Sequence, residues 1–421
     1  MAHVLIAGGG IGGLTAALHL HQAGHEVDVF ESVVTPRELG VGINLLPHSV
    51  RVFDDLGLLP QLEVAAVATS RLRFLSEDGV TIWSEARGRA AGNPWPQLSI
   101  HRGRLQTILL AAARKRLGDD RVHTGHRIVS FTQDATSVTA TFDHREAGGD
   151  STTASETAVT GDVLIGADGL HSTVRKHFID NEGPPVYSGL MLWRGAVEYP
   201  AYGDGHEMFM AGHDQKKAVV YPIRGALKRG GTTLINWVAE EPVDVDVATA
   251  DWNAEIDVAG VAAKFDDWDW GWLNVGALIA ATPVAYQFPM VDRDPLDSWT
   301  DGRVTLLGDA AHAMRPNGSN GSSQAILDGE ALTNAFAAHR SDPPAALLSY
   351  EAERREPTSK IVLANRQSGP ERVMQWVADR CDGSCVDQHV CISSDELERQ
   401  ANEYKKLAGF DLAHLQSLAK N

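Results

Sequence analysis

A glycine-rich turn near the N-terminus, between a predicted strand and a predicted helix, constrains the fold of this chain more than any other feature. Residues 4–13 read VLIAGGGIGG, and residues 4–7 form a short apolar run typical of a buried parallel strand. Gly8, Gly10 and Gly13 then fit the pattern G-x-G-x-x-G. In this pattern the first glycine permits a tight turn, the second lets a pyrophosphate approach the backbone, and the third lets helix and strand pack closely. The turn therefore predicts a dinucleotide-binding unit.

The residues that follow this turn agree with that interpretation. From Ile11 on, small and apolar residues recur at helical spacing, and the first turn of such a helix offers unpaired N–H groups and a positive dipole end to phosphate oxygens. Glu31 ends a second apolar run about 20 residues later, where a carboxylate can accept hydrogen bonds from a ribose diol. Strand, turn, helix and acid occur in the required order, so we predict a dinucleotide site rather than a chance glycine-rich turn.

Length and charge argue against several other kinds of protein. The 421 residues are enough for about two or three domains. The 37 Lys and Arg against 55 Asp and Glu give a net charge of −18, which argues against nucleic acid or an anionic membrane as a partner. No run reaches the roughly 18 apolar residues that a membrane span needs, and we expect no leader sequence. We predict a cytoplasmic protein, monomeric or homodimeric, with no membrane partner.

Three cysteines, Cys381, Cys385 and Cys391, lie close together near the C-terminus. Their spacing matches no standard zinc pattern, although His389 lies among them, so we predict no metal site. We expect all three to be ordinary thiols of a reducing compartment.

The pattern of residue types along the chain predicts a split nucleotide-binding domain. Residues 1–180 and 300–370 carry the glycine-rich turns and alternate strands with helices. Residues 184–299 are rich in Tyr, Trp, Pro and short alternating runs, which indicates an inserted antiparallel sheet that forms a substrate domain. Residues 371–421 have helical texture and no assigned role. A plain NAD dehydrogenase usually keeps its cofactor domain contiguous, so the split favours a different architecture.

Three later motifs bear on the identity of the cofactor. The run SIHRGRLQ places Arg102 at the start of a helix, where a guanidinium can pair with pyrophosphate or ribityl oxygens. The run GADGLHSTVR puts Asp168 and Gly169 on a sharp turn after a strand. The run LLGDAAHAMRPNGSNGSSQA ends a strand at Asp309 and continues through a Gly/Asn/Ser loop into a helix from Gly321.

Together with the first glycine-rich turn, these motifs resemble, in order and separation, the fingerprints of the class A FAD-dependent aromatic hydroxylases. The resemblance covers roughly the first 370 residues. The runs VGINLLPHSV, SIHRG, MLWRG and PMVDRDPL are also similar to the phenazine-carboxylate branch of that family, the 5-methylphenazine-1-carboxylate 1-monooxygenases. The resemblance implies an α/β fold: a Rossmann-like, glutathione-reductase-like FAD-binding domain with the inserted antiparallel β-sheet and a helical C-terminal region.

The resemblance also implies which residues hold FAD. Glu31 would hold the adenosine ribose, Arg102 would reach the pyrophosphate and ribityl region, and Asp309 would hold a ribityl hydroxyl or a phosphate-bound water. Residues 41–44 would border the isoalloxazine, and residues 316–321 would curl over it. The predicted cofactor-binding residues are Gly8, Gly10, Ile11, Gly13, Glu31, Gly42, Ile43, Arg102, Val129, Asp168, Gly169, Asp309, Pro316, Gly321 and Ser322.

The family chemistry comprises two half-reactions. NAD(P)H donates hydride to FAD, and the reduced flavin reacts with O2 to give a C4a-hydroperoxide that hydroxylates an electron-rich ring, with or without loss of a substrate carboxylate. Asp168 and Gly169 would lie near the surface where NAD(P)H docks. No second G-x-G-x-x-G occurs, as expected if NAD(P)H docks only briefly.

The substrate, a small aromatic molecule, is expected between the antiparallel sheet and the flavin. Trp193, Tyr221, Trp237 and Phe288 offer flat walls, and Arg194 can anchor a carboxylate. Residues alternate between the two faces of a strand, so about half of these aromatic residues would instead belong to the core.

No general base is assigned from the sequence. The candidate catalytic residues are Pro316, His213 and Tyr221, whereas His312 is interpreted as a structural hydrogen-bonding residue. Two alternatives share the cofactor fold: a flavin-dependent halogenase or reductase, and a flavin-binding protein without turnover. Trp268, Trp270 and Trp272 resemble part of a halogenase signature but lack its Ile-Pro end, so we interpret them as packing residues.

Overall fold

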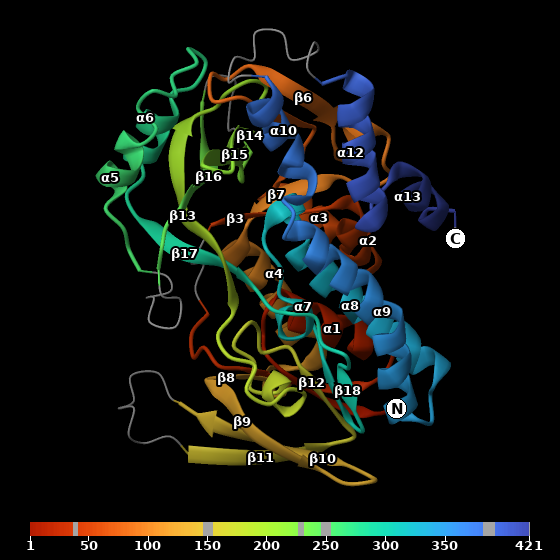
Figure 1. Cartoon of the computed structure of the whole chain (residues 1–421). Coiled ribbons are helices and arrows are strands. Elements are labelled where there is room, and N and C mark those ends of the chain that lie inside the picture. The colour runs from red at the N-terminus through yellow and green to blue at the C-terminus, as the bar shows by residue number, and fades with distance from the viewer. Residues whose placement is uncertain (37–40, 146–154, 226–230, 246–253, 382–391, 421) are drawn as a thin grey trace.

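The computed structural model describes the whole chain except residues 37–40, 146–154, 226–230, 246–253, 382–391 and 421 (Figure 1). Its centre is a six-stranded sheet in the order β18-β19-β12-β1-β2-β8. Neighbouring strands run parallel except at the β18–β19 edge. The sheet contains β1 (His3–Ala7), β2 (Glu26–Glu31), β8 (Val122–Thr124), β12 (Val163–Gly166), β18 (Thr300–Asp301) and β19 (Val304–Leu306).

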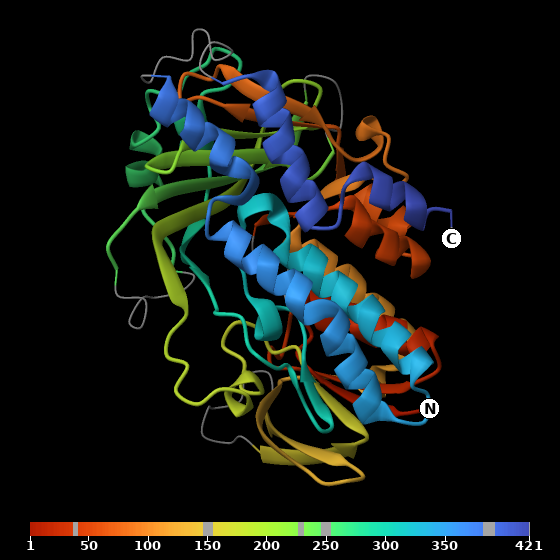
Figure 2. The same ribbon diagram turned by 45° about the vertical axis from the view of Figure 1, so that its right-hand side comes forward.

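Helices pack against this sheet and against one another. They are α1 (Ile11–Gln22), α2 (Pro47–Asp55), α3 (Leu59–Ala65), α4 (Arg102–Leu117), α7 (Asp309–His312), α8 (Gly321–Ala338) and α9 (Pro343–Asn365). Small residues let α1 and α8 approach closely, because a Cβ at Gly329 would lie 2.9 Å from the backbone of Ala16. Figure 2 shows α8 and α9 running side by side along the molecule.

A second, seven-stranded sheet has the order β17-β13-β16-β15-β14-β5-β6. Its strands are β5 (Arg71–Leu75), β6 (Thr81–Ala86), β13 (Val186–Pro200), β14 (Glu207–His213), β15 (Lys216–Pro222), β16 (Thr232–Pro242) and β17 (Ala285–Asp292). Helices α5 (Val258–Ala263) and α6 (Val275–Ala280) cover its outer face. This sheet is antiparallel apart from the β14–β5 pair, and β5 and β6 come from the N-terminal part of the chain.

Two smaller sheets and a C-terminal group of helices complete the described structure. One sheet pairs β3 (Gly42–Leu45) and β4 (Val67–Thr69) with β7 (Gln97–His101), and the other contains β9 (His126–Gln133), β10 (Val138–His144) and β11 (Ser155–Gly161). The C-terminal helices are α10 (Arg372–Arg380), α12 (Ser394–Leu407) and α13 (Leu412–Leu418). Short 3-10 turns lie at Gly88–Ala91, Asp119–Arg121, Arg175–His177, Asn317–Ser319 and Gly369–Glu371.

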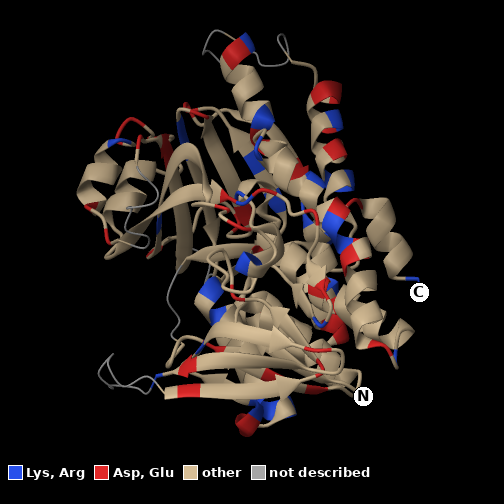
Figure 3. Ribbon diagram, turned by 60° about the horizontal axis from the view of Figure 1, so that its bottom comes forward, with Lys and Arg blue, Asp and Glu red and all other residues tan. Residues whose placement is uncertain are grey.

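The predicted fold class is therefore confirmed: a parallel nucleotide-binding sheet, a large antiparallel sheet and a helical C-terminal region. Figure 3 shows acidic and basic residues interspersed along the ribbon, so the net charge of −18 does not come from one strongly acidic element. Among the described residues, no helix is both long enough and apolar enough to cross a membrane.

One expectation about the cysteines is wrong. Cys381, at the end of α10, is disulfide-bonded rather than a free thiol. Cys385 and Cys391 lie outside the described residues, as does His389.

Candidate functional site

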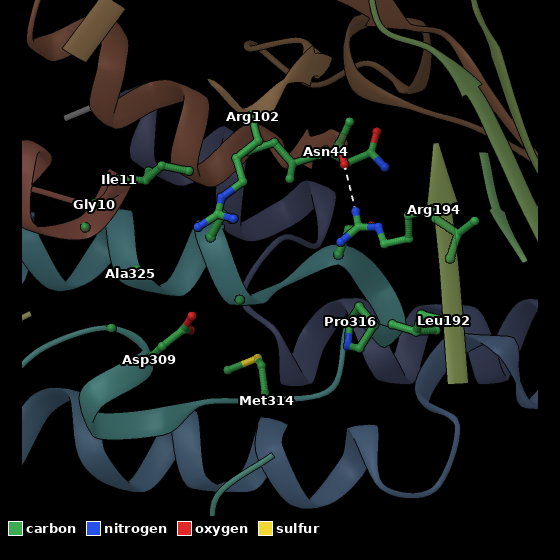
Figure 4. A pocket seen from close by; sticks show the side chains of 18 of the residues that line it. Gly10, Ile11, Asn44, Arg102, Leu192, Arg194, Asp309, Met314, Pro316 and Ala325 are labelled. Atoms are coloured by element: carbon green, nitrogen blue, oxygen red, sulfur yellow. Dashed lines mark hydrogen bonds between the residues drawn. The ribbon is translucent and has the colours of Figure 1, made fainter. Parts of the chain in front are cut away.

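A cavity of about 410 Å³ lies where the two large sheets meet (Figure 4). Its lining from the nucleotide-binding part comprises Gly10, Ile11, Gly12, Gly13, Gly42, Ile43, Asn44, Arg102, Ala167, Gly169, Leu307, Gly308, Asp309, Met314, Pro316, Ser319, Gly321, Ser322 and Ala325. The lining from the seven-stranded sheet comprises Leu192, Arg194, Met208, Met210, Val219, Tyr221, Val238 and Glu240, and Glu371 adds one C-terminal residue. Segments far apart in sequence thus form one site.

The first glycine-rich turn has the geometry that its sequence predicts. Gly8 has a left-handed φ of +121°, and a Cβ there would lie 2.1 Å from the carbonyl oxygen of Ala167. A Cβ on Gly13 would lie 2.0 Å from the carbonyl oxygen of Gly8, so the start of α1 packs directly on the turn. A Cβ on Gly10 would meet no atom within 4 Å, and Gly10 lines the cavity. The N-terminal end of α1 therefore faces open space that an anionic group can occupy.

Glu31 lies at the end of β2, immediately beside this turn. Its carboxylate accepts hydrogen bonds from the backbone N–H of Gly9 at 2.8 Å and of Val33 at 2.7 Å. Although Glu31 does not line the cavity, these bonds fix an acidic group next to Gly10, where the adenosine ribose is predicted.

Asp309 begins α7 and lines the opposite side of the cavity from Arg102. Figure 4 shows both side chains extending toward the same space from separate segments. The turn before Asp309 is held by Asp328, a residue that the sequence analysis missed. Asp328 accepts hydrogen bonds from the backbone N–H of Gly308 at 3.0 Å and from Arg354 at 2.8 Å, and its carboxylate lies 2.7 Å from Nε2 of His312.

The surroundings of Asp328 explain its charge state. Burial alone would raise the pKa of this carboxyl group, but the adjacent His312 and Arg354 lower the pKa to about 2. Asp328 thus remains ionised and anchors the turn, and the structural hydrogen bond expected of His312 is present.

The other predicted cofactor residues have different positions. Gly169, Pro316, Gly321 and Ser322 line the cavity. The carboxylate of Asp168 instead points back into its own turn, where it accepts hydrogen bonds from Ser172 Oγ and from the backbone N–H of Thr173 at 2.6 Å. Burial raises the pKa of Asp168.

Val129 does not belong to the site. It lies on β9 with its side chain exposed, and it is absent from the cavity lining. The structure therefore gives no support to a cofactor contact at this residue.

The loop of residues 316–320, named here the 316–320 loop, forms the cavity wall before α8. The hydroxyl of Tyr404 on α12 accepts a hydrogen bond from Asn320 Nδ2 at 2.8 Å, and it lies 2.8 Å from Asn365 Oδ1, which can accept its proton. The ring of Tyr404 also lies where a Cβ on Gly318 would be, because that Cβ would be 2.2 Å from the tyrosine oxygen. A C-terminal helix thus holds a cavity loop that the sequence analysis had not connected with it.

Strand alternation decides which predicted substrate residues reach the cavity. On β13, Leu192 and Arg194 face the cavity, so Trp193 between them faces α5 and α6. Trp237 likewise lies in the outer core, where its indole N–H donates to Thr282 Oγ1 at 2.8 Å. The prediction that Trp193 and Trp237 line the substrate pocket is wrong, because on each strand the neighbouring residues face the cavity and the tryptophan faces the outer core.

Two of the predicted substrate residues, Arg194 and Tyr221, do line the cavity. Arg194 donates a hydrogen bond to the carbonyl oxygen of Gly42 at 3.0 Å, and its charged group lies 5.9 Å from the centre of the Phe288 ring. Phe288 itself is absent from the cavity lining. No carboxylate forms an ion pair with Arg194 within the part of the chain that the structure describes.

The charge states of this pair follow from burial. Burial lowers the pKa of the Arg194 guanidinium, whereas the nearby Tyr221 raises it. Burial raises the pKa of Tyr221 to about 12, despite the opposing effect of Arg194. At neutral pH, Tyr221 is therefore a neutral hydroxyl group beside a cation, and the pair can bind an anionic ligand group.

His213, one of the candidate catalytic residues, lies outside the cavity. Its Nε2 lies 3.1 Å from a carboxylate oxygen of Glu77, at the far end of β14. Of the three catalytic candidates, Pro316 and Tyr221 are thus the ones that line the cavity.

The three tryptophans of the DWDWGW run pack on the opposite side of the seven-stranded sheet. Trp270 and Trp272 contact Phe209 edge-to-face with ring centres 5.5 and 5.4 Å apart. Phe209 belongs to the outer core, whereas its neighbours Met208 and Met210 face the cavity. The interpretation of these tryptophans as packing residues is confirmed.

The residues of the cavity fit FAD. Two helix N-terminal ends, at Gly10 and Gly321, and the cation Arg102 provide donors for a pyrophosphate. Asp309 supplies an acceptor for hydroxyl groups, and the open position at Gly10 leaves room for phosphate against the backbone. The cavity then continues over apolar residues of the seven-stranded sheet, where an aromatic ring can bind.

Comparison with known proteins agrees with this site. The sequence model of a family described as "FAD binding domain" matches residues 1–261 and 285–365. Phenazine 1,6-dicarboxylic acid hydroxylase PhzS of Lysobacter antibioticus is 44% identical over 370 residues, which cover 86% of this chain and 89% of that protein. The 3-hydroxybenzoate 6-hydroxylase of Polaromonas naphthalenivorans is 30% identical over 375 residues, with 87% of each protein covered.

Solved structures have the same fold. The crystal structure of Klebsiella pneumoniae HpxO complexed with FAD and uric acid matches with a TM-score of 0.69 and 24% sequence identity. The match covers 96% of this chain and 92% of that structure, so the fold extends over both cavity walls.

Proposed function

The chain belongs to the FAD-binding family of aromatic hydroxylases and is an FAD-dependent aromatic monooxygenase, and on this premise we propose that its substrate is a phenazine-type aromatic carboxylate. The observation that carries the proposal is the joint position of Arg194 and Tyr221 in the cavity wall across from the glycine-rich turn. A cation and a neutral hydroxyl at the edge of an apolar surface suit a flat acid. The 44% identity to a phenazine dicarboxylic acid hydroxylase supports this class of substrate.

We assign the cavity residues roles in two groups. Gly10, Arg102 and Asp309 would hold the phosphates and ribityl chain of FAD, and Glu31 would hold the adenosine ribose from beside the turn. FAD, once reduced by NAD(P)H, supplies the electrons that activate O2 for insertion of one oxygen atom into the aromatic ring. Residues 1–180 and 300–370 would form the FAD-binding domain and residues 184–299 the substrate domain.

The residues of the sheet would orient the substrate and exclude water. Leu192, Met210, Val219 and Val238 provide apolar surface against which an aromatic ring can lie. Arg194 would bind the substrate carboxylate through charge-assisted hydrogen bonds, and this orients one edge of the ring in the cavity. These apolar side chains would also limit the access of water to the reacting groups.

Some sequence predictions remain proposals. We propose that NAD(P)H docks near Gly169 and that the protein works as a monomer or homodimer in the cytoplasm. A halogenase is the less favoured alternative, because the tryptophans that suggested it pack on the sheet face remote from the cavity.

The experiment supplies the purified FAD-loaded protein with NADPH or NADH, phenazine-1-carboxylate and oxygen-18 gas, with chloride present. We expect the aromatic acid to accelerate NAD(P)H oxidation and the product to carry one labelled oxygen atom. Unsubstituted phenazine, which lacks the carboxylate, should accelerate oxidation much less. A chlorinated product, or oxidation that no aromatic acid stimulates, would overturn the proposal.

A further inference from the structure

A buried Glu-Lys-Glu cluster lies in the cavity wall, and neither the sequence analysis nor the proposed roles above account for it. Glu240 on β16 and Glu371 line the cavity, and each is 6% exposed. Lys217 lies directly opposite Glu240 on β15 and forms ion pairs with both glutamates, at 2.6 Å to Glu240. Asn317 Nδ2 donates to the same oxygen of Glu371, Oε2, at 2.9 Å.

The remaining oxygen of each glutamate is available to a ligand. Lys217 contacts Oε2 of both residues, and the other oxygen, Oε1, has no hydrogen-bond donor among the described residues. A carboxylate oxygen is a strong hydrogen-bond acceptor, so each Oε1 can accept a hydrogen bond from a donor on a ligand. Because both glutamates line the cavity, a ligand there can supply the missing donors.

Strand register places this cluster beyond the Arg194 end of the sheet face. Arg194 on β13 pairs with Val238 on β16. Two residues further along β16, Glu240 pairs with Leu192 on one side and with Lys217 on the other. The Arg194 side chain hydrogen-bonds the carbonyl oxygen of Gly42 and interacts with Tyr221, which pairs with Asn236, while its interaction with Glu240 is weaker. The apolar row of Val219 and Val238 lies between the two polar ends.

The charges of the two ends differ once an acid is bound. Lys217, Glu240 and Glu371 carry a formal net charge of −1, which Arg194 balances. A substrate carboxylate on Arg194 removes that balance and leaves the glutamates with excess negative charge. This charge favours a hydrogen-bond donor at the second edge of the ligand and disfavours another carboxylate.

We propose that Glu240 and Glu371 form a hydrogen-bond-accepting subsite that selects aromatic acids with an O–H or N–H donor on the edge remote from the carboxylate. The inference rests on the proposed function, since it takes the carboxylate to bind Arg194. The inference also goes beyond what the family match covers, because that match ends at residue 365 and Glu371 lies after it. Lys217 is a positioning residue that orients both carboxylates.

The test measures dissociation constants of three probes from flavin fluorescence, without NAD(P)H. The probes are phenazine-1-carboxylate, its 6-hydroxy derivative and phenazine-1,6-dicarboxylate. The wild-type protein should bind the hydroxy acid about tenfold more tightly than the dicarboxylate, as expected for satisfying rather than repelling a buried carboxylate. Glu240→Gln should reduce this preference to less than about threefold, because an amide carries no charge and can donate to the second carboxylate.

Glu241→Gln is the matched control, since Glu241 is the next residue on β16 and forms an ion pair with Lys264 at 2.6 Å. Glu371→Gln provides a second variant if Glu240→Gln fails to fold, and it should also reduce the preference. Equal affinities for the hydroxy acid and the dicarboxylate, or equal effects of Glu240→Gln and Glu241→Gln, would overturn the subsite. If none of the three acids binds, the proposed substrate class fails instead.

Discussion

Arg194 is a cation in the wall of an otherwise largely apolar sheet face, and replacing it tests substrate recognition at the level of one residue. Arg194→Ala should weaken the binding of phenazine-1-carboxylate about tenfold to a hundredfold, as expected for the loss of charge-assisted hydrogen bonds. Titration of the flavin fluorescence with the acid gives the dissociation constant. Arg224→Ala is the control, because Arg224 is an exposed arginine that pairs with Glu198. Equal effects of both changes would contradict the role of Arg194.

The charge state of Tyr221 leads to a second prediction. Its pKa of about 12 lies above the ordinary value near 10, so the hydroxyl stays protonated across the working range. Affinity for the acid should therefore show no tyrosine-linked step between about pH 6 and pH 10. Tyr221→Phe should weaken binding severalfold through loss of one hydrogen bond, with the pH profile unchanged. A step near pH 8 that disappears in the variant would show that Tyr221 ionises.

For single residues, the sequence predicted the site correctly where the backbone geometry allows only one residue type. Gly8 and Gly13 lie at positions where a Cβ would collide with backbone atoms, so their spacing identifies the turn directly. The choice between Trp193 and Arg194 as the cavity residue could not be made in the same way. Both faces of β13 are covered, one by α5 and α6 and the other by the cofactor domain, so hydrophobicity does not reveal which face binds the ligand.

The elements that meet at the cavity include one from the C-terminal region. The 316–320 loop belongs to a motif that the sequence reveals, but Tyr404 of α12, which holds it, lies more than 80 residues away. The helical texture of residues 371–421 was predicted correctly for α10, α12 and α13. The contact of α12 with the loop could not be predicted, because it depends on tertiary packing, which leaves no local sequence pattern. Glu240, Glu371 and Asp328 were missed for the same reason.

Removal of the Tyr404 hydroxyl tests this contact. Tyr404→Phe removes one hydrogen bond each from the amide groups of Asn320 and Asn365 and should lower the free energy of unfolding by about 1–3 kcal/mol. Because the 316–320 loop lines the cavity, the affinity for FAD should fall as well. Denaturant unfolding and FAD titration of the apoprotein measure the two effects.

The matched control is Tyr187→Phe. Tyr187 lies on β13, and its hydroxyl donates a hydrogen bond to the carbonyl oxygen of Val243 at 2.6 Å. That change should lower stability without weakening FAD binding. If both variants retain the FAD affinity of the wild type, α12 has no part in shaping the cofactor site.

In the whole molecule, the cavity joins the nucleotide-binding sheet to the seven-stranded sheet. A ligand that binds the folded state alone stabilises it by about 2.7 kcal/mol at a hundredfold excess over its dissociation constant. FAD should therefore raise the melting temperature of the apoprotein, and the two sheets should unfold in one transition, since residues of both surround the cavity. Calorimetry with increasing FAD tests this expectation. Two transitions, of which FAD shifts only one, would indicate independent parts.

At this scale the sequence indicated that two separated stretches form one sheet, because the motifs at Gly8 and Asp309 flank a region rich in short alternating runs, and the six-stranded sheet does combine strands from both stretches. The sequence did not reveal that β5 and β6 complete the seven-stranded sheet. Pairing between distant strands depends on the assembled fold rather than on local propensity.

The most direct test of the central claim, that one cavity holds both the cofactor and the aromatic acid, is an experimental structure of the protein with FAD and phenazine-1-carboxylate. We predict that the FAD phosphates contact the backbone at Gly10 and that the carboxylate lies within hydrogen-bonding distance of Arg194. A structure in which FAD avoids the glycine-rich turn, or in which the acid binds outside this cavity, would contradict the account.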